Sequence, residues 1–470
     1  MTVSTRQFEI TEAVITSPLI RTPLDIKNVI VDLELYENIE RPYVSGKVNL
    51  IDTNGVFTSD NMLNFRGGET LAINVEVNLS SSPTENATYD IKRTFTITGI
   101  EKMASAGNDS AMMIVLSIVD PWVFKNYVRK FSRSFSGSPT EIIRKILTDE
   151  RLLGLPQEIL QTSGEPPVQK NMKVVIPYLT PLGAVEFIRD RCTTKNGSPF
   201  FLRSNVHSWF ETGDGWLTFE SLDYLLSLRP FNIDAPFVQS VAMINSDPSW
   251  AKPDQLVMDN VEFGENHNSL STIMSGGLSS QLSVTDISSN KRIRSKHNID
   301  RMLLNLRNQG VLKEDDRQNI FNEGIFFNEE GLEALPSMYF HQIVNSNSYT
   351  DANSFYDDLS PADYRKRVEN IALRAALMQN FVKVQVPSYI FMAAESGVGE
   401  TVSLLFSGNA GGADTPEIEQ LIDYDKSGNY LIYSLRHSFA AGAMSSSMRA
   451  CKLDKNYKLS PITNFEPWKQ

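Results

Sequence analysis

The sequence predicts an α+β protein that is predominantly β, with two related antiparallel, tube-like β-barrels, an inserted small α/β domain and a helix-rich insertion. Three observations predict this fold. Runs of alternating apolar and polar residues occupy both ends of the chain, capped helical patterns occur in the middle, and a short sequence near the N-terminus is repeated near the C-terminus.

The first β-barrel is expected over residues 1–125. Within Glu69–Leu79 every second residue is apolar, and Val29–Leu35 repeats the pattern. A period of two is typical of a strand with one buried face and one wet face. Turn sequences such as Asp52–Gly55 separate these runs, and no helical pattern lies between them, which favours an antiparallel sandwich or barrel.

The α/β domain is expected over residues 126–235, where the period changes. Ser138–Glu141 is a capping box with proline at the first helical position, and apolar residues follow it at helical spacing. Thr180-Pro181 starts a second helix, and Pro199–Leu202 reads as a strand after it. The order strand, helix, strand predicts a small mixed domain.

The rest of the chain returns to β-structure around a polar stretch. We assign residues 236–300 to the start of the second β-barrel, 301–379 to the helix-rich insertion, 380–455 to the completion of that barrel and 456–470 to a C-terminal tail. Within the insertion we expect helices at Arg301–Arg307 and after Ser360–Asp363, with a loop at Asn345–Asn353.

An internal echo links the two β-regions. Gly68–Leu71 (Gly-Glu-Thr-Leu) opens a strand in the first, and Gly399–Val402 (Gly-Glu-Thr-Val) opens one in the second; further along, Asp120 aligns with Asp454. Either one barrel design is used twice, or Gly-Glu-Thr is simply a common strand opening. Three copies of a chain with two related barrels would place six similar modules in a ring, as joining a threefold object to a sixfold one requires.

Composition narrows the class of protein. The chain is 41% apolar and 21% charged, with 44 Lys and Arg against 56 Asp and Glu, a net charge of −12. This balance disfavours a protein that wraps nucleic-acid phosphates. Nine basic against sixteen acidic residues in the first 120 concentrate the acidity in the first barrel. Two cysteines, no signal-peptide pattern and only short apolar runs predict assembly in a reducing cytoplasm without a membrane span.

Catalytic and metal-binding patterns are missing from the sequence. It contains no His-Glu-x-x-His, no Cys-x-x-Cys, no phosphate-binding glycine loop and no nucleophile elbow. We therefore assign no catalytic, cofactor-binding or metal-binding residues, expect no cofactor and expect no enzymatic activity. The isolated residues that could have carried chemistry are His207, His267, His297, His341, His437, Cys192 and Cys451.

Two segments admit a functional and a structural interpretation. Asp423–Gly428 resembles the first half of a calcium loop, but the twelfth position would be Ser434 inside a strand pattern, so we favour an Asp/Gly turn. Lys125–Lys145 is locally basic and interleaved with aromatic residues. It is either a docking surface for an acidic partner or nucleic acid, or, as we favour, a helix whose aromatic stripe packs inward.

Several segments resemble central baseplate hub proteins of contractile-tailed bacteriophages. The resemblance covers most of the chain and is carried by Ile15–Pro18, Val31–Ile39, Val44–Asp52, Asn171, Ile176–Pro181, Pro199–Leu202, Phe219–Asp223, Ser427–Ile432 and His437–Phe439. The stretch from about 300 to 379 is longer than a minimal member of that family would have.

The resemblance implies a homotrimer whose two tube-like barrels per chain form a pseudo-sixfold ring. Such a hub joins the hexameric ring of tail tube protein to the trimeric spike protein, and continues the channel through which DNA passes without specific binding. It also implies a virion location in the tail baseplate, assembly in the host cytoplasm, and neighbouring wedge proteins and the tape measure protein as further partners. An acidic barrel would suit a channel lining, because like charge keeps DNA off the wall.

Two other classes remain open from the sequence. One is another β-rich baseplate or tail-fibre attachment protein, which would share the strand pattern. The other is a cell-wall hydrolase using a pair of acidic residues in the α/β section, since scattered carboxylates are abundant.

Overall fold

A computed structural model represents the chain. It describes residues 7–18, 23–53, 57, 68–79, 88–105, 111–167, 172–194, 197–208, 216–233, 236–239, 257–265, 279–287, 290–298, 338–344, 370, 373–374, 377, 380–407, 423 and 426–452. Within these residues the fold is α+β and dominated by antiparallel sheet, as the sequence predicts.

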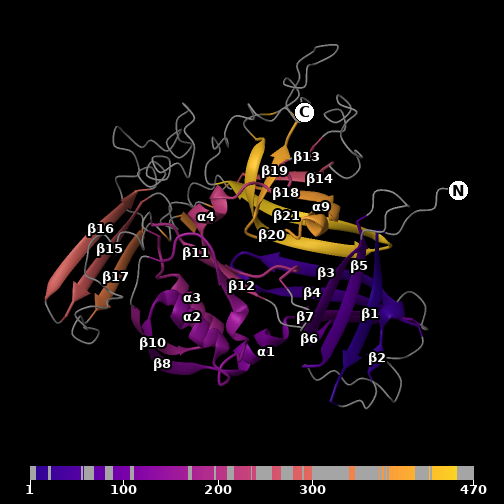
Figure 1. Ribbon diagram of the computed structural model, residues 1–470, viewed down its shortest axis with the longest axis horizontal. Coiled ribbons are helices and arrows are strands. Elements are labelled where there is room, and N and C mark those ends of the chain that lie inside the picture. The colour runs from indigo at the N-terminus through magenta and orange to yellow at the C-terminus, as the bar shows by residue number, and fades with distance from the viewer. Residues whose placement is uncertain are drawn as a thin grey trace, which may run out of the picture.

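One sheet of thirteen strands runs through both β-regions (Figure 1). Its main path is β14-β18-β21-β20-β3-β4-β7-β6-β5-β1-β2, and β19 joins β20 to β13. The strands are β1 (Phe8–Thr16), β2 (Leu24–Asp25), β3 (Ile30–Asn38), β4 (Arg41–Asp52), β5 (Thr70–Asn78), β6 (Thr88–Ser105), β7 (Met112–Val119), β13 (Phe237–Val238), β14 (Asp259–Glu265), β18 (Asn380–Pro387), β19 (Thr401–Leu405), β20 (Gly428–Ala440) and β21 (Ala443–Lys452).

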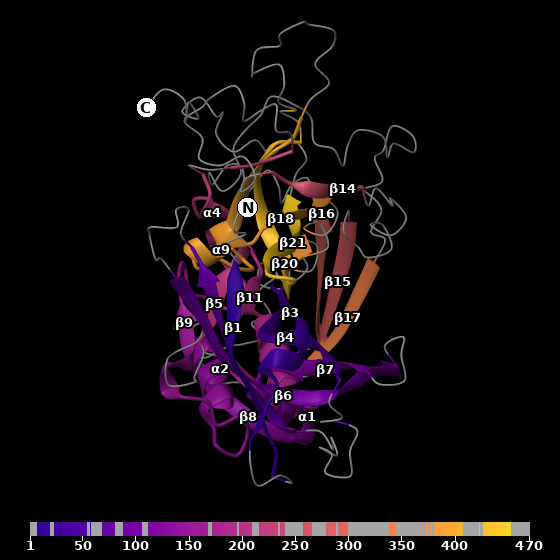
Figure 2. The same ribbon diagram turned by 90° about the vertical axis from the view of Figure 1, so that its right-hand side faces the viewer.

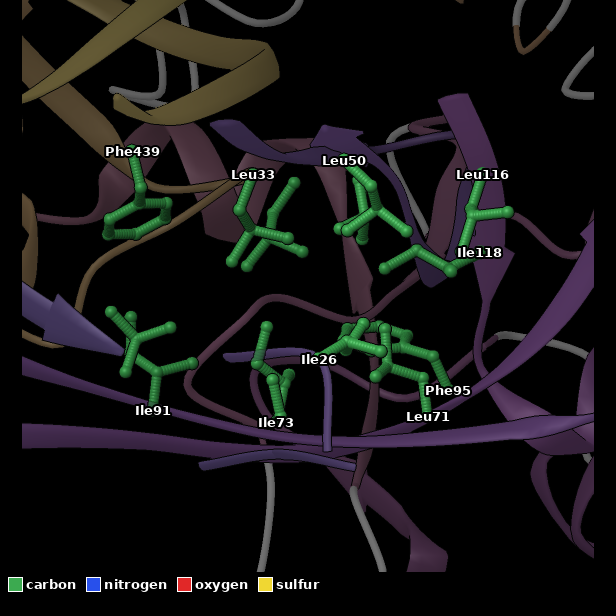
Figure 3. Packing of buried hydrophobic residues seen from close by; sticks show 14 of the residues in the cluster. Ile26, Leu33, Leu50, Leu71, Ile73, Ile91, Phe95, Leu116, Ile118 and Phe439 are labelled. Carbon is green, nitrogen blue, oxygen red and sulfur yellow. The ribbon is translucent and has the colours of Figure 1, made fainter. Parts of the chain in front are cut away.

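The N-terminal part of this sheet curls over its own apolar face. Figure 3 shows Leu33, Leu50 and Leu116 in one layer, facing Ile73 and Phe95 in the other. These side chains are buried because alternate residues of each strand point to the same face. The alternation predicted for β5 is confirmed, and so is that of β3 from Leu33 onward; Val31 is exposed, because a bulge between Ile30 and Asp32 shifts the register there.

A second core lies under the C-terminal strands. Val382, Val384 and Val386 of β18 are buried, and they pack with residues of β19, β20 and β21. Helix α9 (Tyr389–Ala393) contributes Phe391, whose ring lies 5.1 Å from that of Phe231. The two predicted barrels therefore have separate cores but share one sheet.

The α/β domain has a core of its own. Its elements are α1 (Pro121–Val128), β8 (Phe131–Gly137), α2 (Pro139–Thr148), the 3-10 turn η2 (Gln157–Ile159), β9 (Leu160–Thr162), β10 (Met172–Leu179), α3 (Pro181–Arg189), β11 (Phe200–Arg203), β12 (Leu217–Ser221) and α4 (Leu222–Ser227). The predicted capping box is present, since Ser138 accepts from Glu141 N–H and Glu141 accepts from Ser138 N–H. Thr180 likewise caps α3 through Gly183 N–H.

A separate three-stranded sheet stands apart from the large one in both views (Figure 2). It consists of β15 (Ser279–Asp286), β16 (Lys291–Asn298) and β17 (Met338–Val344), with β15 in the centre. β15 pairs antiparallel with β16 and parallel with β17. Residues 301–379 thus contribute a strand as well as the helical positions 370, 373, 374 and 377. The helix expected at Arg301–Arg307, the loop at Asn345–Asn353 and the Ser360–Asp363 cap lie outside the described residues.

Among the helices that the structure describes, none combines the length and the apolar character that crossing a bilayer requires.

Two glycines that open equivalent strands allow a matched stability test. Gly68 (φ +92°) and Gly399 (φ +83°) both have a backbone that disfavours other residues. An added Cβ at Gly68 meets nothing nearer than Phe124 Cζ at 4.0 Å, whereas at Gly399 it overlaps the Arg203 side chain. Gly68→Ala should lower the free energy of unfolding by about 1–2 kcal/mol.

Gly399→Ala should cost more, about 3 kcal/mol or above, because it also displaces Arg203 from its buried partner Glu220. Urea denaturation of the two variants and the wild type measures both values. Equal losses would contradict the packing of Arg203 against Gly399.

Candidate functional site

The predicted echo is present in the backbone hydrogen bonds of the first β-region. Gly68 N–H donates to Ile97 O (3.0 Å), and Ile97 N–H donates to Glu69 O (2.7 Å). This exchange closes the start of β5 onto β6. Immediately after Ile97 the register of β6 against β7 shifts at a β-bulge, between Ile97 and Gly99.

The second β-region repeats this arrangement. Gly399 N–H donates to Ile432 O (2.9 Å), and Ile432 N–H donates to Glu400 O (2.9 Å). The bulge recurs too, because the register of β20 against β21 shifts between Ile432 and Ser434. A shared tripeptide alone could be coincidence, but a shared exchange followed by a shared bulge indicates two copies of one design.

The registers extend this correspondence across four strands on each side. β6, β7, β4 and β3 pair in that order, and β20, β21, β18 and β14 do the same. We call these the N-terminal quartet and the C-terminal quartet. The registers align Val119 with Cys451, so Asp120 corresponds to Lys452 and not to Asp454 as the sequence comparison placed it. Residue 454 lies outside the described residues.

Side chains follow the same correspondence. Lys47 lies opposite Glu34 in the N-terminal quartet, and Lys383 lies opposite Glu262 in the C-terminal quartet. Lys383 Nζ is 3.2 Å from Glu262 Oε2. In β6 a second bulge follows between Ile100 and Lys102, and β20 has none at the matching place.

The quartets meet where β20 pairs with β3, and this junction, the seam, is the candidate functional site. Seven residues of β20, from Ser434 to Ala440, lie antiparallel to β3. On the polar face Arg436 forms an ion pair with Glu34, and Ser438 Oγ donates to Asp32 Oδ1 at 3.4 Å. On the apolar face Leu35 lies opposite the buried His437. Figure 1 shows the yellow β20 running beside the indigo β3.

A buried carboxylate lies under the seam. Glu37 Oε1 accepts from Val206 N–H (2.6 Å), and Oε2 accepts from Val398 N–H (3.1 Å). His437 Nε2 is 3.8 Å from Glu37 Oε1. Burial favours the neutral acid, but the neighbouring His437 and the Val206 N–H favour the carboxylate more and lower the pKa of Glu37. One side chain of β3 thereby fixes two loops from distant parts of the chain.

His207 lies next to this carboxylate. Its Nδ1 is 2.8 Å from Tyr89 Oη, and the side chain is buried. Burial lowers the pKa of His207 to about 3, although the charge of Glu37 opposes the shift. His207 is therefore neutral at physiological pH. The sequence gives no sign that His207 and His437 meet, because 230 residues separate them and Glu37 links them only in the fold.

Two further buried ion pairs fasten the α/β domain to the sheet. Arg93 pairs with Asp120 (2.8 Å) and also donates to the carbonyls of Asn205 and Val206. Arg203 pairs with Glu220 (2.8 Å) and donates to Val398 O. Each arginine thus joins a side-chain partner to a loop carbonyl, which compensates part of the cost of burying its charge.

The polar face of the sheet is hollowed at the seam. The hollow measures about 500 Å³, and its lining includes Tyr36, Arg41, Tyr43, Lys383, Arg436 and Arg449. The acidic lining expected from composition is not what this face carries. Four bases line the hollow, and among the described residues its only acid is the buried Glu37. On this face bases also pair with acids, as in Lys47–Glu101 and Arg436–Glu34. Part of the acidity of the first 120 residues is buried instead, at Glu37, Asp52, Glu69 and Asp120.

The basic stretch Lys125–Lys145 is not one helix with an inward aromatic stripe, so that interpretation is wrong. It covers the second half of α1, all of β8 and most of α2, and Phe124 and Tyr127 of α1 are exposed. Its bases hold the following loop: Arg129 donates to carbonyls of Glu150 and Leu152, and Arg133 pairs with Asp149 (2.9 Å). The helical pattern of the sequence does not predict these contacts, because β8, which pairs with β10, separates α1 from α2.

The other isolated residues do not assemble into a site. Cys192 and Cys451 are buried thiols, and burial raises the pKa of Cys451 to about 12. His297 lies on β16, His341 is exposed on β17, and His267 lies outside the described residues. In the described part of the chain no three His, Cys, Asp or Glu residues gather as metal ligands. Asp423 Oδ1 accepts from Lys426 N–H in a turn that precedes β20. Ser434, which would be the twelfth position of a calcium loop, lies within β20.

Comparisons with known proteins found likeness in solved structures only. No family model and no curated protein sequence matches the chain. The 43 kDa tail protein of prophage MuSo2 from Shewanella oneidensis is 10% identical with a TM-score of 0.49, over 94% of this chain and 99% of that one. A tail protein from Neisseria meningitidis MC58 is 10% identical with a TM-score of 0.48, over 95% and 99%.

A type VI secretion component of Escherichia coli, described as similar to bacteriophage T4 tail proteins gp27 and gp5, is 10% identical with a TM-score of 0.42. The match covers 95% of this chain and 79% of that one. All three TM-scores lie below 0.5, so the role proposed for the chain rests on its own geometry.

Replacing Glu37 by glutamine tests the buried carboxylate. Both oxygens accept from a backbone N–H, so an amide NH₂ would face a donor in either orientation. We expect Glu37→Gln to lower the free energy of unfolding by about 2–4 kcal/mol, measured by urea denaturation. Glu9→Gln, at an exposed acid on β1 of the same sheet, is the control and should change it by less than about 0.5 kcal/mol. A neutral Glu37→Gln would contradict the role of Glu37.

The lowered pKa of His207 predicts that the fold loses stability in acid. Its pKa is about 3 in the folded protein against 6.5 in the unfolded chain, so between these values the unfolded chain binds more protons. The stabilisation is complete above about pH 6.5 and is lost as the pH falls toward 3. The urea midpoint of the wild type should fall over this window, and His207→Phe should show a shallower fall. Parallel pH profiles would contradict the assignment.

Proposed function

We propose that the chain is the structural hub of a contractile phage tail baseplate. Three copies form a ring in which six sheet quartets surround a channel. One side of the ring meets the hexameric tail tube, and the other meets the trimeric spike. The tape measure protein and neighbouring wedge proteins are further partners, and the hub is assembled in the host cytoplasm and resides in the virion.

The seam is the observation that carries this proposal. One chain pairs two equivalent quartets side by side in a single sheet, so each copy spans two positions of a sixfold arrangement. A threefold set of such chains presents six similar surfaces to a hexameric partner and three equivalent sites to a trimeric one. The sequence resemblance to baseplate hub proteins supports the same assignment.

The polar face suits the wall of a channel. Two of the bases that line the hollow are paired with acids, Lys383 with Glu262 and Arg436 with Glu34, which lowers the positive charge that the wall offers to DNA. DNA then passes without specific binding. The purified protein should give no shift of duplex DNA in a gel at physiological salt.

The buried polar groups support a structural rather than an enzymatic role. Glu37 accepts hydrogen bonds from loop backbone, and Arg93 and Arg203 donate to loop carbonyls as well as to their ion-pair partners. Groups held in this way stabilise the arrangement of the domains.

Cryo-electron microscopy of the concentrated, purified chain tests the proposal. We expect closed rings with threefold symmetry and six related lobes around a channel. Elongated or twofold assemblies would overturn the hub and favour a peripheral baseplate or fibre-attachment protein. Clearing of peptidoglycan by the same sample, abolished by a single Glu→Gln change, would instead establish a cell-wall hydrolase.

A further inference from the structure

The far end of β6 is equivalent to the part of β20 that pairs with β3 in the seam, but it has no such partner strand within the described chain. β6 pairs with β5 up to Thr96, and beyond that residue its only strand partner in the described chain is β7. The equivalent part of β20, from Ser434 to Ala440, carries β3 on the corresponding edge. The far end of β6 therefore has an open edge where its counterpart has a seam.

A complementary open edge occurs at the other end of the sheet. β14 is the counterpart of β3, and it pairs with β18 on one side. Within the described residues no strand pairs with its other side, the side on which β3 receives β20. Open edges attract other strands, and folded proteins generally cover or pair them.

We infer that β6 of one copy pairs antiparallel with β14 of the next copy, and that this contact reproduces the internal seam between chains. The inference rests on the proposed ring and names the strands that close it. The internal seam sets the register: Met103 corresponds to His437 and Phe263 to Leu35, so these two lie opposite each other across the contact.

The exposure of apolar side chains distinguishes the two locations. Ile100 and Met103 on β6 are 38% and 45% exposed, whereas their counterparts Leu435 and His437 in the internal seam are 2% and 0% exposed.

β14 shows the same contrast. Phe263 is 36% exposed against 1% for its counterpart Leu35. Pairing β6 with β14 would cover the exposed apolar residues of both strands, and burial of apolar area drives such association.

Charges are also complementary in this register. Lys102 occupies the position of Arg436, and Glu262 occupies that of Glu34. Because Arg436 and Glu34 form an ion pair across the internal seam, Lys102 of one copy should meet Glu262 of the next. Head-to-tail contacts of this kind close into a ring when the rotation between copies divides a full turn.

Disulfide trapping in the full-length chain tests the register. Ala104 and Glu262 are directly opposed, as Ser438 and Glu34 are within the chain. Under oxidation by copper phenanthroline, Ala104→Cys/Glu262→Cys should form covalent dimers and trimers, resolved by non-reducing electrophoresis. Ser438→Cys/Glu34→Cys should close within one chain and calibrates the geometry. Met103→Cys/Glu262→Cys, one residue out of register, should cross-link far less because the two side chains point to opposite faces.

Charge reversal tests the same contact without cysteines. Lys102→Glu should weaken assembly about tenfold by mass photometry, and adding Glu262→Lys together with Lys383→Glu, which keeps the pair within the chain with its charges exchanged, should restore it.

The outcomes separate the pairing of β6 with β14 between chains from the threefold ring. Threefold rings without the Ala104–Glu262 cross-link would overturn this pairing and leave the proposed hub intact. The cross-link in assemblies of another symmetry would support the pairing and overturn the threefold hub. A chain that stays monomeric and uncross-linked at every concentration would overturn the pairing.

Discussion

Backbone pairing between β3 and β20 is the interaction on which the rest of the structure depends. The pairing joins two strand quartets, which would otherwise each end in an open edge, into one sheet with two cores beneath it. Glu37 is placed directly under it and receives one backbone N–H from each of two loops. The loop around Val206 and the segment before β19 therefore take their positions from this strand boundary, and the pairs Arg93–Asp120 and Arg203–Glu220 fasten the α/β domain beside it.

The sequence predicts elements well where a local pattern determines them. The alternation in β5 and in β3 from Leu33 onward, the Ser138 capping box and the Thr180 helix start follow from periodicity and local hydrogen bonding, and all are present. The internal repeat was visible as two Gly-Glu-Thr sequences, because both glycines adopt a positive φ that few other residues tolerate.

Contacts between distant segments were not predictable in the same way. Nothing near Glu37 in the sequence indicates Val206, Val398 or His437, since these meet only after the sheet has formed. Composition was a poor guide to surface charge, because buried acids such as Asp120 count toward the net charge without reaching the surface. The basic stretch misled for a related reason: its arginines bind carbonyl groups of the chain itself.

The extra bulge in β6 has a consequence for symmetry. A bulge increases local strand twist, and β20 has no counterpart of the one between Ile100 and Lys102. In the proposed ring, the strand pairing within a chain and the strand pairing between chains would then differ in twist, and the two kinds of pairing would alternate around the ring. A tube contacting all six lobes could average over that difference, whereas a trimeric ligand would meet two registers that are no longer equivalent and would dock in phase with the bulges.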